Sequence, residues 1–347
     1  MIALTIKRII MNITIKEWGI TPTDETIHLF RLTNETGAFI ELTDWGATWV
    51  SAYMYDNNHQ LSNVLLSFAD ATECMQDPYY KGATVGRFAN RIHKASFTIQ
   101  HKTFLLEKND GDNTNHGGYT GFNKKRWQWE QVTDGIRFKL HSPHGEGGYP
   151  GNVAIEVTYL FSETNDVTIL YRGTTDQATY LNPTNHAYFN LSGTAATVDG
   201  HCLYIPSKQI LETTEAFIPT GNFNNVTHTP FDFTTPHLIG EHLHDDNEQL
   251  RWNKGYNHCY ILKAETSHEL QTAAILSHPE SGRKLTVETD LPGVLLYTAG
   301  YLPVPDTGVC LETQYFPDTP SHPHFPSCLL LPGEEYQHQT IYKFRIS

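Results

Sequence analysis

The chain of 347 residues carries 38 Asp and Glu against 24 Lys and Arg, a formal net charge of −14 at pH 7. It contains no basic run and no stretch near the roughly 20 apolar residues that a membrane-spanning helix needs, so nucleic acid and membranes are not expected partners. Aromatic residues make up 12% and charged residues only 18% of the chain, which favours strands over exposed helices.

The N-terminal segment MIALTIKRII is apolar but lacks the arrangement of a secretory signal, because its basic residues follow the apolar ones. Met11 opens a second plausible start of the chain. Residues 1–10 are therefore predicted to be an N-terminal extension outside the fold.

Segments in which apolar and polar residues alternate recur along the rest of the chain, and most are bounded by Gly, Asn, Asp or Pro, as strands are. The predicted strands are residues 27–34, 38–45, 48–54, 96–107, 137–142, 152–161, 166–174, 283–290 and 293–300. Only residues 239–253 suggest a helix, of one or two turns. No linker or low-complexity tract divides the chain. We expect an all-β fold, one large antiparallel β-sandwich domain over residues 11–347 with few short helices.

The segment NPTNHAYFNL (182–191) has an unusual distribution of polar residues. If it is a strand, its two faces alternate, and one face carries Asn182, Thr184, His186, Tyr188 and Asn190. The other face ends in Ala187, Phe189 and Leu191. Asn is a poor strand former, so two Asn residues on one strand face need an explanation.

The cysteines are odd in number and form no CxxC pair, which argues against a disulfide framework and a zinc knuckle. They are Cys74, Cys202, Cys259, Cys310 and Cys328. A reducing cytoplasm is the expected compartment.

Two further stretches carry the groups of acid–base chemistry. NTNHGGYTGFNKKRW (113–127) places His116 before two glycines, and GVCLETQYFPDTP (308–320) contains Glu312 in an apolar setting. A strand over the second stretch would put four side chains on one face, those of Cys310, Glu312, Gln314 and Phe316. A strand carboxylate and histidines suit general acid–base catalysis without a metal or cofactor. A Glu and a His that lie close together stabilise each other's charged form.

Each of these residues also has a purely structural interpretation. His186 alone fits a hydrogen-bonded strand histidine, and Glu312 alone fits a solvated strand face. His116 fits a turn, and Arg87 and Arg91 fit ion pairs at a rim. The tracts EHLHDD (241–246) and SHPHFP (321–326) resemble metal-binding sequences, but HxH alone lacks the further ligands of a site, so no metal is expected.

Taken together, the motifs resemble the aldose 1-epimerase family, also called galactose mutarotases, from about residue 13 to the C-terminus. The resemblance rests on GATVGRFANRI, NHGG with GFNKKRW, GEGGYPGN, NPTNHAYFNLSG, TPFDF, KGYNHCYIL, and GVCLETQYFPDTP leading to LLPGEEYQHQTIYKF. It implies a galactose mutarotase-like β-supersandwich that interconverts the α and β anomers of free hexoses such as galactose or glucose. It also implies that no metal, cofactor or covalent intermediate is needed.

The resemblance implies a role for each motif residue. Glu312 would be the catalytic base and His186 the catalytic acid. His116, Arg91 and Asn90 would contact sugar hydroxyls. Tyr188 would lie near His186, and the polar face of residues 182–190 would form the floor of the sugar site.

Two positions depart from the family pattern. Asn257 stands where the family usually has Asp, and Leu291 stands where many members have Gln. A charged acceptor bond is worth more than a neutral one, so the change at Asn257 is expected to cost about fivefold in affinity. Leu cannot hydrogen-bond, so one sugar contact would be missing or replaced. Both departures concern which sugar is preferred more than the reaction class.

Three other functions remain open from the sequence. The chain could be a sugar-binding or sensing protein without catalysis on the same scaffold. A hexose-6-phosphate epimerase would need several Lys or Arg around a dianion, and no such cluster is evident. A glycoside hydrolase would need a second catalytic carboxylate beside Glu312. The expected partner is a free monosaccharide, and the chain is expected to be a monomer or homodimer.

Overall fold

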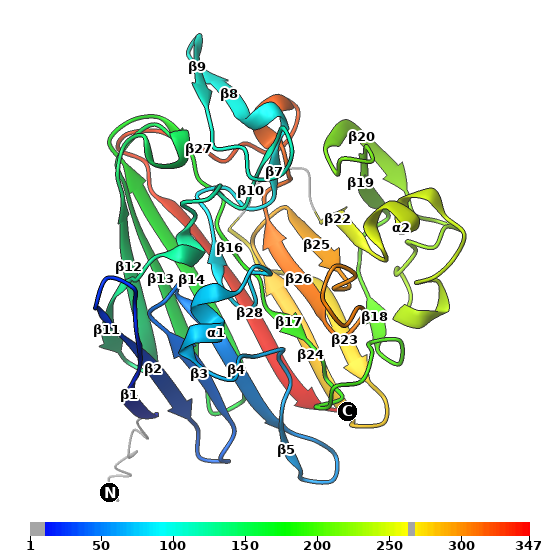
Figure 1. Ribbon diagram of the computed structural model, residues 1–347. Helices are drawn as coiled ribbons and strands as arrows, with labels where there is room; N and C mark the ends of the chain where they lie inside the picture. The colour runs from blue at the N-terminus through cyan, green and yellow to red at the C-terminus, as the bar shows by residue number, and fades with distance from the viewer. Residues whose placement is uncertain (1–10, 263–267) are drawn as a thin grey trace, which may run out of the picture.

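The computed structural model describes residues 11–262 and 268–347. The predicted N-terminal extension, residues 1–10, lies outside the described residues. Within them the fold is all-β, as predicted: two α-helices of six residues each and five short 3₁₀ turns accompany the strands (Figure 1). None of these helices is long and apolar enough to cross a membrane.

Three larger sheets build the structure, and every pairing between their strands is antiparallel. The first contains β1 (Asn12–Ile20), β2 (Thr26–Thr33), β3 (Phe39–Thr43), β4 (Thr48–Tyr55) and β5 (Leu61–Asn63), in that order. The second follows the order β11 (Gln128–Val132), β12 (Gly135–Ser142), β13 (Val153–Phe161), β14 (Asp166–Thr175), β28 (Tyr336–Ile346), β24 (Arg283–Thr289), β23 (Gln271–His278), β18 (Cys202–Tyr204) and β21 (His237–Leu238). The third follows the order β17 (Tyr188–Phe189), β26 (Val309–Gln314), β25 (Gly293–Tyr297), β22 (Asn257–Ile261), β19 (Gln209–Thr213) and β20 (Pro219–Asn225).

Smaller elements surround these sheets. Four strand pairs are β6 (Thr84–Val85) with β16 (Thr184–Asn185), β7 (Arg91–Ile92) with β10 (Thr114–Asn115), β8 (Ser96–Ile99) with β9 (Lys102–Leu105), and β15 (Thr179–Tyr180) with β27 (Leu329–Leu330). The helices are α1 (Ala71–Gln76) and α2 (Glu248–Asn253). The 3₁₀ turns are η1 (His93–Ala95), η2 (Phe122–Lys124), η3 (Glu146–Gly148), η4 (Ile239–Glu241) and η5 (Thr319–Ser321).

Aromatic side chains join the three sheets into one core. Trp49 of β4 packs edge-on against Phe189 of β17 and Tyr342 of β28, with ring centroids 5.8 and 5.4 Å apart. Phe189 and Tyr342 also contact each other, at 5.4 Å. The five-stranded and six-stranded sheets therefore pack on the same face of the nine-stranded sheet, which is the sandwich that the alternating strands predict.

The structure differs from the sequence prediction in three segments. Residues 96–107 are a hairpin of β8 and β9, not one strand, because Gln100 and His101 turn the chain with φ of +49° and +66°. Residues 182–190 form only the two-residue strands β16 and β17. Residues 239–253, by contrast, contain the short helical turns that were expected, η4 and α2. Helix α1, which was not predicted, begins after Asp70, whose side chain accepts a hydrogen bond from the Glu73 backbone N–H.

Candidate active site

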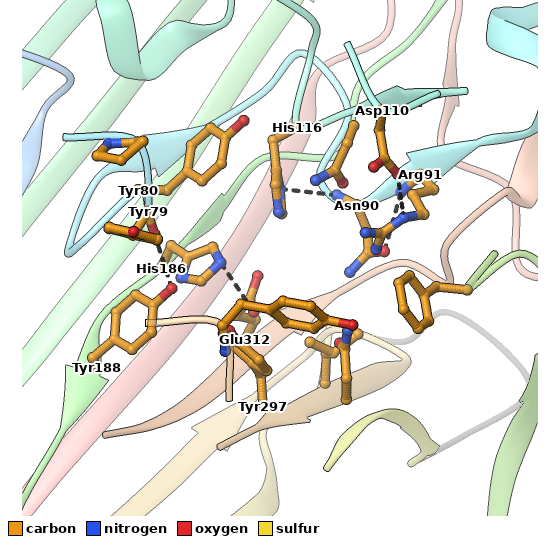
Figure 2. Close-up of a pocket in the computed structure, with 16 residues that line it drawn as sticks. Tyr79, Tyr80, Asn90, Arg91, Asp110, His116, His186, Tyr188, Tyr297 and Glu312 are labelled. Carbon is orange, nitrogen blue, oxygen red and sulfur yellow. Dashed lines mark hydrogen bonds and ion pairs between the residues drawn. The ribbon is translucent and has the colours of Figure 1, made fainter. Parts of the chain in front are cut away.

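A cavity of about 270 Å³ opens where the six-stranded sheet meets the loops after α1 and β9 and the β7–β10 strand pair (Figure 2). We call it the Glu312 cavity. Its lining consists of Pro78, Tyr79, Tyr80, Asn90, Arg91, Asp110, Asn115, His116, His186, Tyr188, Phe217, Asn257, Leu295, Tyr297, Tyr301 and Glu312. The structure thus brings together all seven site residues named from the sequence, although they span more than two hundred positions of the chain.

Strand pairing places Glu312 and His186 face to face. In the β17–β26 ladder Tyr188 pairs with Cys310. Continuing this antiparallel register by two residues brings His186 opposite Glu312. The His186 Nε2 and Glu312 Oε1 atoms lie 3.6 Å apart, and both side chains are almost fully buried.

The carboxyl group of Glu312 is held in a poorly solvated position. Burial raises its pKa to about 8, and the charge of Arg91 only partly offsets this rise. Within the part of the chain that the structure describes, Oε2 has no hydrogen-bond partner. A buried carboxyl oxygen without a partner is available to a hydroxyl group of a bound molecule.

The imidazole of His186 is oriented by a neighbouring thiol and by aromatic rings. Its Nδ1 lies 3.5 Å from Cys310 Sγ. Burial raises the pKa of the Cys310 thiol, which therefore stays protonated and can donate to Nδ1. Tyr188 and Tyr80 stack on the imidazole with centroids 5.0 and 5.9 Å away. This arrangement favours the tautomer with its proton on Nε2, the nitrogen that faces Glu312.

Burial also keeps His186 neutral until strongly acidic pH, because it lowers the pKa of the imidazole to about 4. The Cys310 and Glu312 contacts use different nitrogens of this ring. One ligand atom each from His186, Cys310 and Glu312 can also be chosen so that the three atoms lie within 4.8 Å of one another, the spacing of a group that could hold a metal ion.

His116 and Asn90 form the wall of the cavity next to His186, whose ring meets that of His116 edge-on with centroids 5.2 Å apart (Figure 2). The Asn90 backbone N–H donates to His116 Nδ1 over 3.1 Å, which leaves the His116 proton on Nε2. Burial, His186 and Arg91 hold the pKa of His116 well below its ordinary value, so the ring is a neutral donor. Both residues have a positive φ, +66° at Asn90 and +51° at His116.

Arg91 is held beside this wall by an acidic residue that the sequence analysis missed. Its Nε donates to Asp110 Oδ2 over 2.6 Å, and the Arg91 side chain is mostly buried. Its charge lowers the pKa of Glu312. The pair supplies a fixed cation within the cavity.

The sequence analysis also missed most of the aromatic lining. Tyr79 accepts a hydrogen bond from the Tyr188 hydroxyl through its backbone carbonyl, at 2.9 Å. Leu295 pairs with Glu312 across the β25–β26 ladder, and Tyr297 follows on the same face. The alternation in residues 293–300 contained a signal for these last two side chains, but the strand partner could not be read from it. The remaining missed residues follow from tertiary structure alone. Pro78, Tyr80, Phe217 and Tyr301 lie in loops, and Asn115 ends the two-residue strand β10.

Only part of the polar face of residues 182–190 belongs to the cavity. His186 and Tyr188 line it. Asn182 and Thr184 instead hydrogen-bond the backbone of β26 and its extension, and Asn190 bonds backbone carbonyls of neighbouring loops. The prediction that these three residues form the floor of the sugar site is therefore wrong. Their side chains instead satisfy buried backbone groups.

Arg87 and Leu291 do not line the cavity and serve the packing of the fold. Arg87 is not at a rim: it is 2% exposed and donates to Ser142 and to the carbonyls of residues 142, 143 and 150. Leu291 is fully buried in the main hydrophobic core and does not line the cavity. The expectation that Leu291 marks a missing sugar contact is not supported, because its side chain packs among apolar residues.

The histidine tracts do not gather a ligand set. His242 pairs with Asp245 at 2.8 Å, and His322 and His324 face backbone carbonyls of β20. Neither tract contributes to a cluster of three potential metal ligands within residues 11–262 and 268–347.

The amino-acid sequence of the chain matches a known protein family. The profile described as aldose 1-epimerase matches residues 28–343. Galactose mutarotase from Sus scrofa is 37% identical over 334 residues, which cover 93% of this chain and 95% of that protein. Aldose 1-epimerase from Escherichia coli (strain K12) is 36% identical over 340 residues, 94% of this chain and 97% of that protein.

Solved structures agree with the sequence comparison. An aldose epimerase homologue from C. elegans superposes with a TM-score of 0.85 at 27% identity, covering 92% of this chain and 98% of that one. Galactose 1-epimerase from Lactobacillus acidophilus NCFM also gives 0.85, at 25% identity, covering 97% and 99%. The galactose mutarotase-like sandwich and the matches along nearly the whole length lead to one conclusion: the chain belongs to the aldose 1-epimerase family.

Proposed function

We propose that this chain, an isomerase of the aldose 1-epimerase family, interconverts the α and β anomers of a free hexose such as galactose or glucose. The observation that carries the proposal is the contact between Glu312 and His186, 3.6 Å apart in a buried cavity. A cavity of about 270 Å³ is small among ligand sites and suits one monosaccharide.

In the proposed reaction Glu312 accepts the proton of the C1 hydroxyl while His186 donates a proton to the ring oxygen. The C1–O5 bond breaks and the sugar opens to its aldehyde. Rotation about C1–C2 presents the other carbonyl face, and ring closure returns both protons to where they began. No atom or electron is gained or lost, so the two side chains suffice as acid and base.

The pKa values of the pair are compatible with these roles. Between the value of about 4 for His186 and about 8 for Glu312, the two groups together hold one titratable proton. A neutral carboxyl beside a neutral imidazole and a carboxylate beside an imidazolium have the same proton count. The reactive arrangement, a carboxylate beside an imidazolium that carries a proton on each nitrogen, therefore needs no change in the total proton count of the pair.

The other polar side chains would orient the sugar. His116 and Arg91 are donors that line the cavity near the Glu312–His186 pair, and Asn90 and Asn257 offer amide groups. Tyr188 is one of several aromatic rings suited to the apolar face of a pyranose. We assign these five residues to substrate binding.

The other functions left open by the sequence fit the cavity less well. Among the described residues that line it, Arg91 is the only Lys or Arg, and Asp110 already neutralises it, so a sugar phosphate would lack its cation cluster. Asp110 is a second carboxylate in the cavity, but it is bound to Arg91 and does not serve as a glycosidase partner for Glu312.

We also propose that the enzyme works in the cytoplasm, since all five cysteines are unpaired. The single domain over residues 11–347 and the monomeric or homodimeric state stay predictions.

Polarimetry tests the proposed function. Freshly dissolved α-D-galactose or α-D-glucose should reach its equilibrium rotation faster with the wild-type chain. Glu312→Gln should slow this catalysed relaxation by at least about 100-fold while sugar binding, measured by calorimetry, persists. Equal relaxation rates for wild type and variant, with both binding sugar, would instead identify a sugar-binding protein without catalysis.

A further inference from the structure

A second cavity, of about 610 Å³, lies beside the C-terminal end of β24 and the start of β28. Its lining includes His268, Asp290 and His338, none of which lines the Glu312 cavity. We propose that these three residues form a Zn²⁺ site, separate from the catalytic centre.

The ligand atoms have spacings suited to one small ion. His338 Nδ1 lies 3.2 Å from Asp290 Oδ2, and His268 Nδ1 lies 3.8 Å from the same oxygen. One ligand atom from each residue can be chosen so that all lie within 4.8 Å of one another. A tetrahedral zinc ion with bonds of about 2.0–2.1 Å holds its ligands about 3.3 Å apart. Small movements of the His268 side chain would complete the set.

Neighbouring groups aim two of these ligands. Asp290 Oδ1 accepts a hydrogen bond from the Gln339 backbone N–H at 2.9 Å, which leaves Oδ2 for an ion. His338 Nε2 lies 3.0 Å from the Tyr315 hydroxyl, which leaves Nδ1 on the ligand side. Metal-binding histidines and carboxylates are characteristically held in this way by partners behind them.

The His338 Nδ1 atom is buried without a hydrogen-bond partner in the described part of the chain, which independently indicates that an ion binds here. The side chain is only 7% exposed, yet Nδ1 makes no hydrogen bond to any described residue. Asp290 Oδ2 is 3.2 Å away but lies outside hydrogen-bond geometry. Buried polar atoms seldom lack a partner, and an ion between Nδ1 and Oδ2 would satisfy both.

The donor set and the local charge favour zinc over calcium or magnesium. Two imidazoles and one carboxylate match Zn²⁺, whereas the harder ions prefer oxygen ligands throughout. Two arginines also line this cavity, but each has an acidic partner: Arg137 pairs with Glu130 at 2.9 Å and Arg172 pairs with Glu335 at 3.6 Å. Their repulsion of a cation is thereby reduced.

The ion would connect an exposed residue to the sheet. The His268 side chain is 83% exposed and precedes β23, whereas Asp290 and His338 are buried at the ends of β24 and β28. Its ring already lies 6.0 Å from that of His338, at an interplanar angle of 30°. Binding of Zn²⁺ would link the segment before β23 to the ends of β24 and β28 and stabilise the fold.

Calorimetric titration of the chelator-treated full chain with ZnCl₂ tests the site. The wild type should show one saturable site per chain, and His268→Ala and Asp290→Asn should each weaken it by at least about tenfold. His268→Ala removes an exposed side chain and leaves the core intact. Zn²⁺ should raise the thermal unfolding midpoint of the wild type but not of His268→Ala.

The chain has 19 histidines, so His244→Ala is the matched control for non-specific binding of zinc by exposed histidines. His244 is also exposed and also faces a carboxylate, Asp306 at 3.9 Å. This variant should bind Zn²⁺ as the wild type does. Absence of saturable binding, or equal affinity in the wild type and His268→Ala, overturns the proposal, as does a matching loss in His244→Ala.

Discussion

Cys310 Sγ lies 3.5 Å from Nδ1 of His186, while Nε2 of the same imidazole faces Glu312. Because a thiol that donates to Nδ1 keeps the proton on Nε2, Cys310 is a positioning residue for the proposed acid. Cys310→Ala should lower kcat about fivefold, the worth of about 1 kcal/mol for one neutral hydrogen bond, with little change in KM. Cys310→Ser keeps a donor and should retain most of the activity in polarimetric assays. Equal losses in both variants would indicate that packing, not the hydrogen bond, is what matters.

The pH profile of catalysis should be broad. Below the His186 pKa of about 4 the pair gains a second proton, and above the Glu312 pKa of about 8 it loses its last one. Activity should therefore be nearly flat between these values and fall on either side. Measurement of kcat/KM from below pH 4 to above pH 8 checks this. An acid limb at the ordinary histidine pKa of about 6.5 would contradict it.

Glu312 should also make the fold less stable at alkaline pH. The folded chain holds the Glu312 proton up to about pH 8, whereas the unfolded chain releases it near the ordinary value of 4.5. Between these values the folded state binds more protons, so the free energy of unfolding decreases as pH rises. The decrease from this group is up to about 4 kcal/mol.

The variant Glu312→Gln has no ionisable group at this position, so its comparison with the wild type measures the contribution of Glu312 to the pH dependence of stability. Urea unfolding of wild type and variant at about pH 5 and about pH 9 should show a smaller pH-dependent loss in Glu312→Gln. The comparison between pH values removes any constant effect of the buried amide. Identical pH dependence in both chains would mean that Glu312 is not the group responsible.

Asn257 should limit affinity for galactose. It lines the Glu312 cavity, and its side chain offers a neutral acceptor where the family resemblance implies a carboxylate. Asn257→Asp should lower KM about fivefold, since a hydrogen bond to a charged acceptor is worth about 1 kcal/mol more. Asn257→Ala is the control and should raise KM. An unchanged KM in both variants would show that this position does not touch the sugar.

Leu291 and Leu295 should respond differently to the same substitution. Leu291 is in the core, so Leu291→Gln should destabilise the fold by about 1–3 kcal/mol in urea unfolding and leave KM unchanged. Leu295 lines the cavity beside Glu312, its partner on the neighbouring strand, so Leu295→Gln should alter KM at a smaller cost in stability. A KM effect confined to Leu291→Gln would restore the original expectation for that position.

The sequence by itself determined the fold class and the identity of the chemical groups. Alternation in segments such as residues 152–161 specified buried and exposed faces locally, because side chains on a strand alternate whatever the partner strand is. The motifs around Glu312 and His186 carried the family resemblance, which the comparisons confirmed. Such signals are local in the chain and survive without knowledge of the fold.

Only the tertiary structure decided which polar residues face the cavity. Arg87 and Arg91 come from one motif, yet Arg87 binds buried carbonyls and Arg91 enters the cavity. Asp110 and Tyr80 come from loops without a periodic pattern. The physical reason is that a polar side chain satisfies either buried backbone groups or a ligand, and the choice depends on strand register and loop packing between segments far apart in sequence.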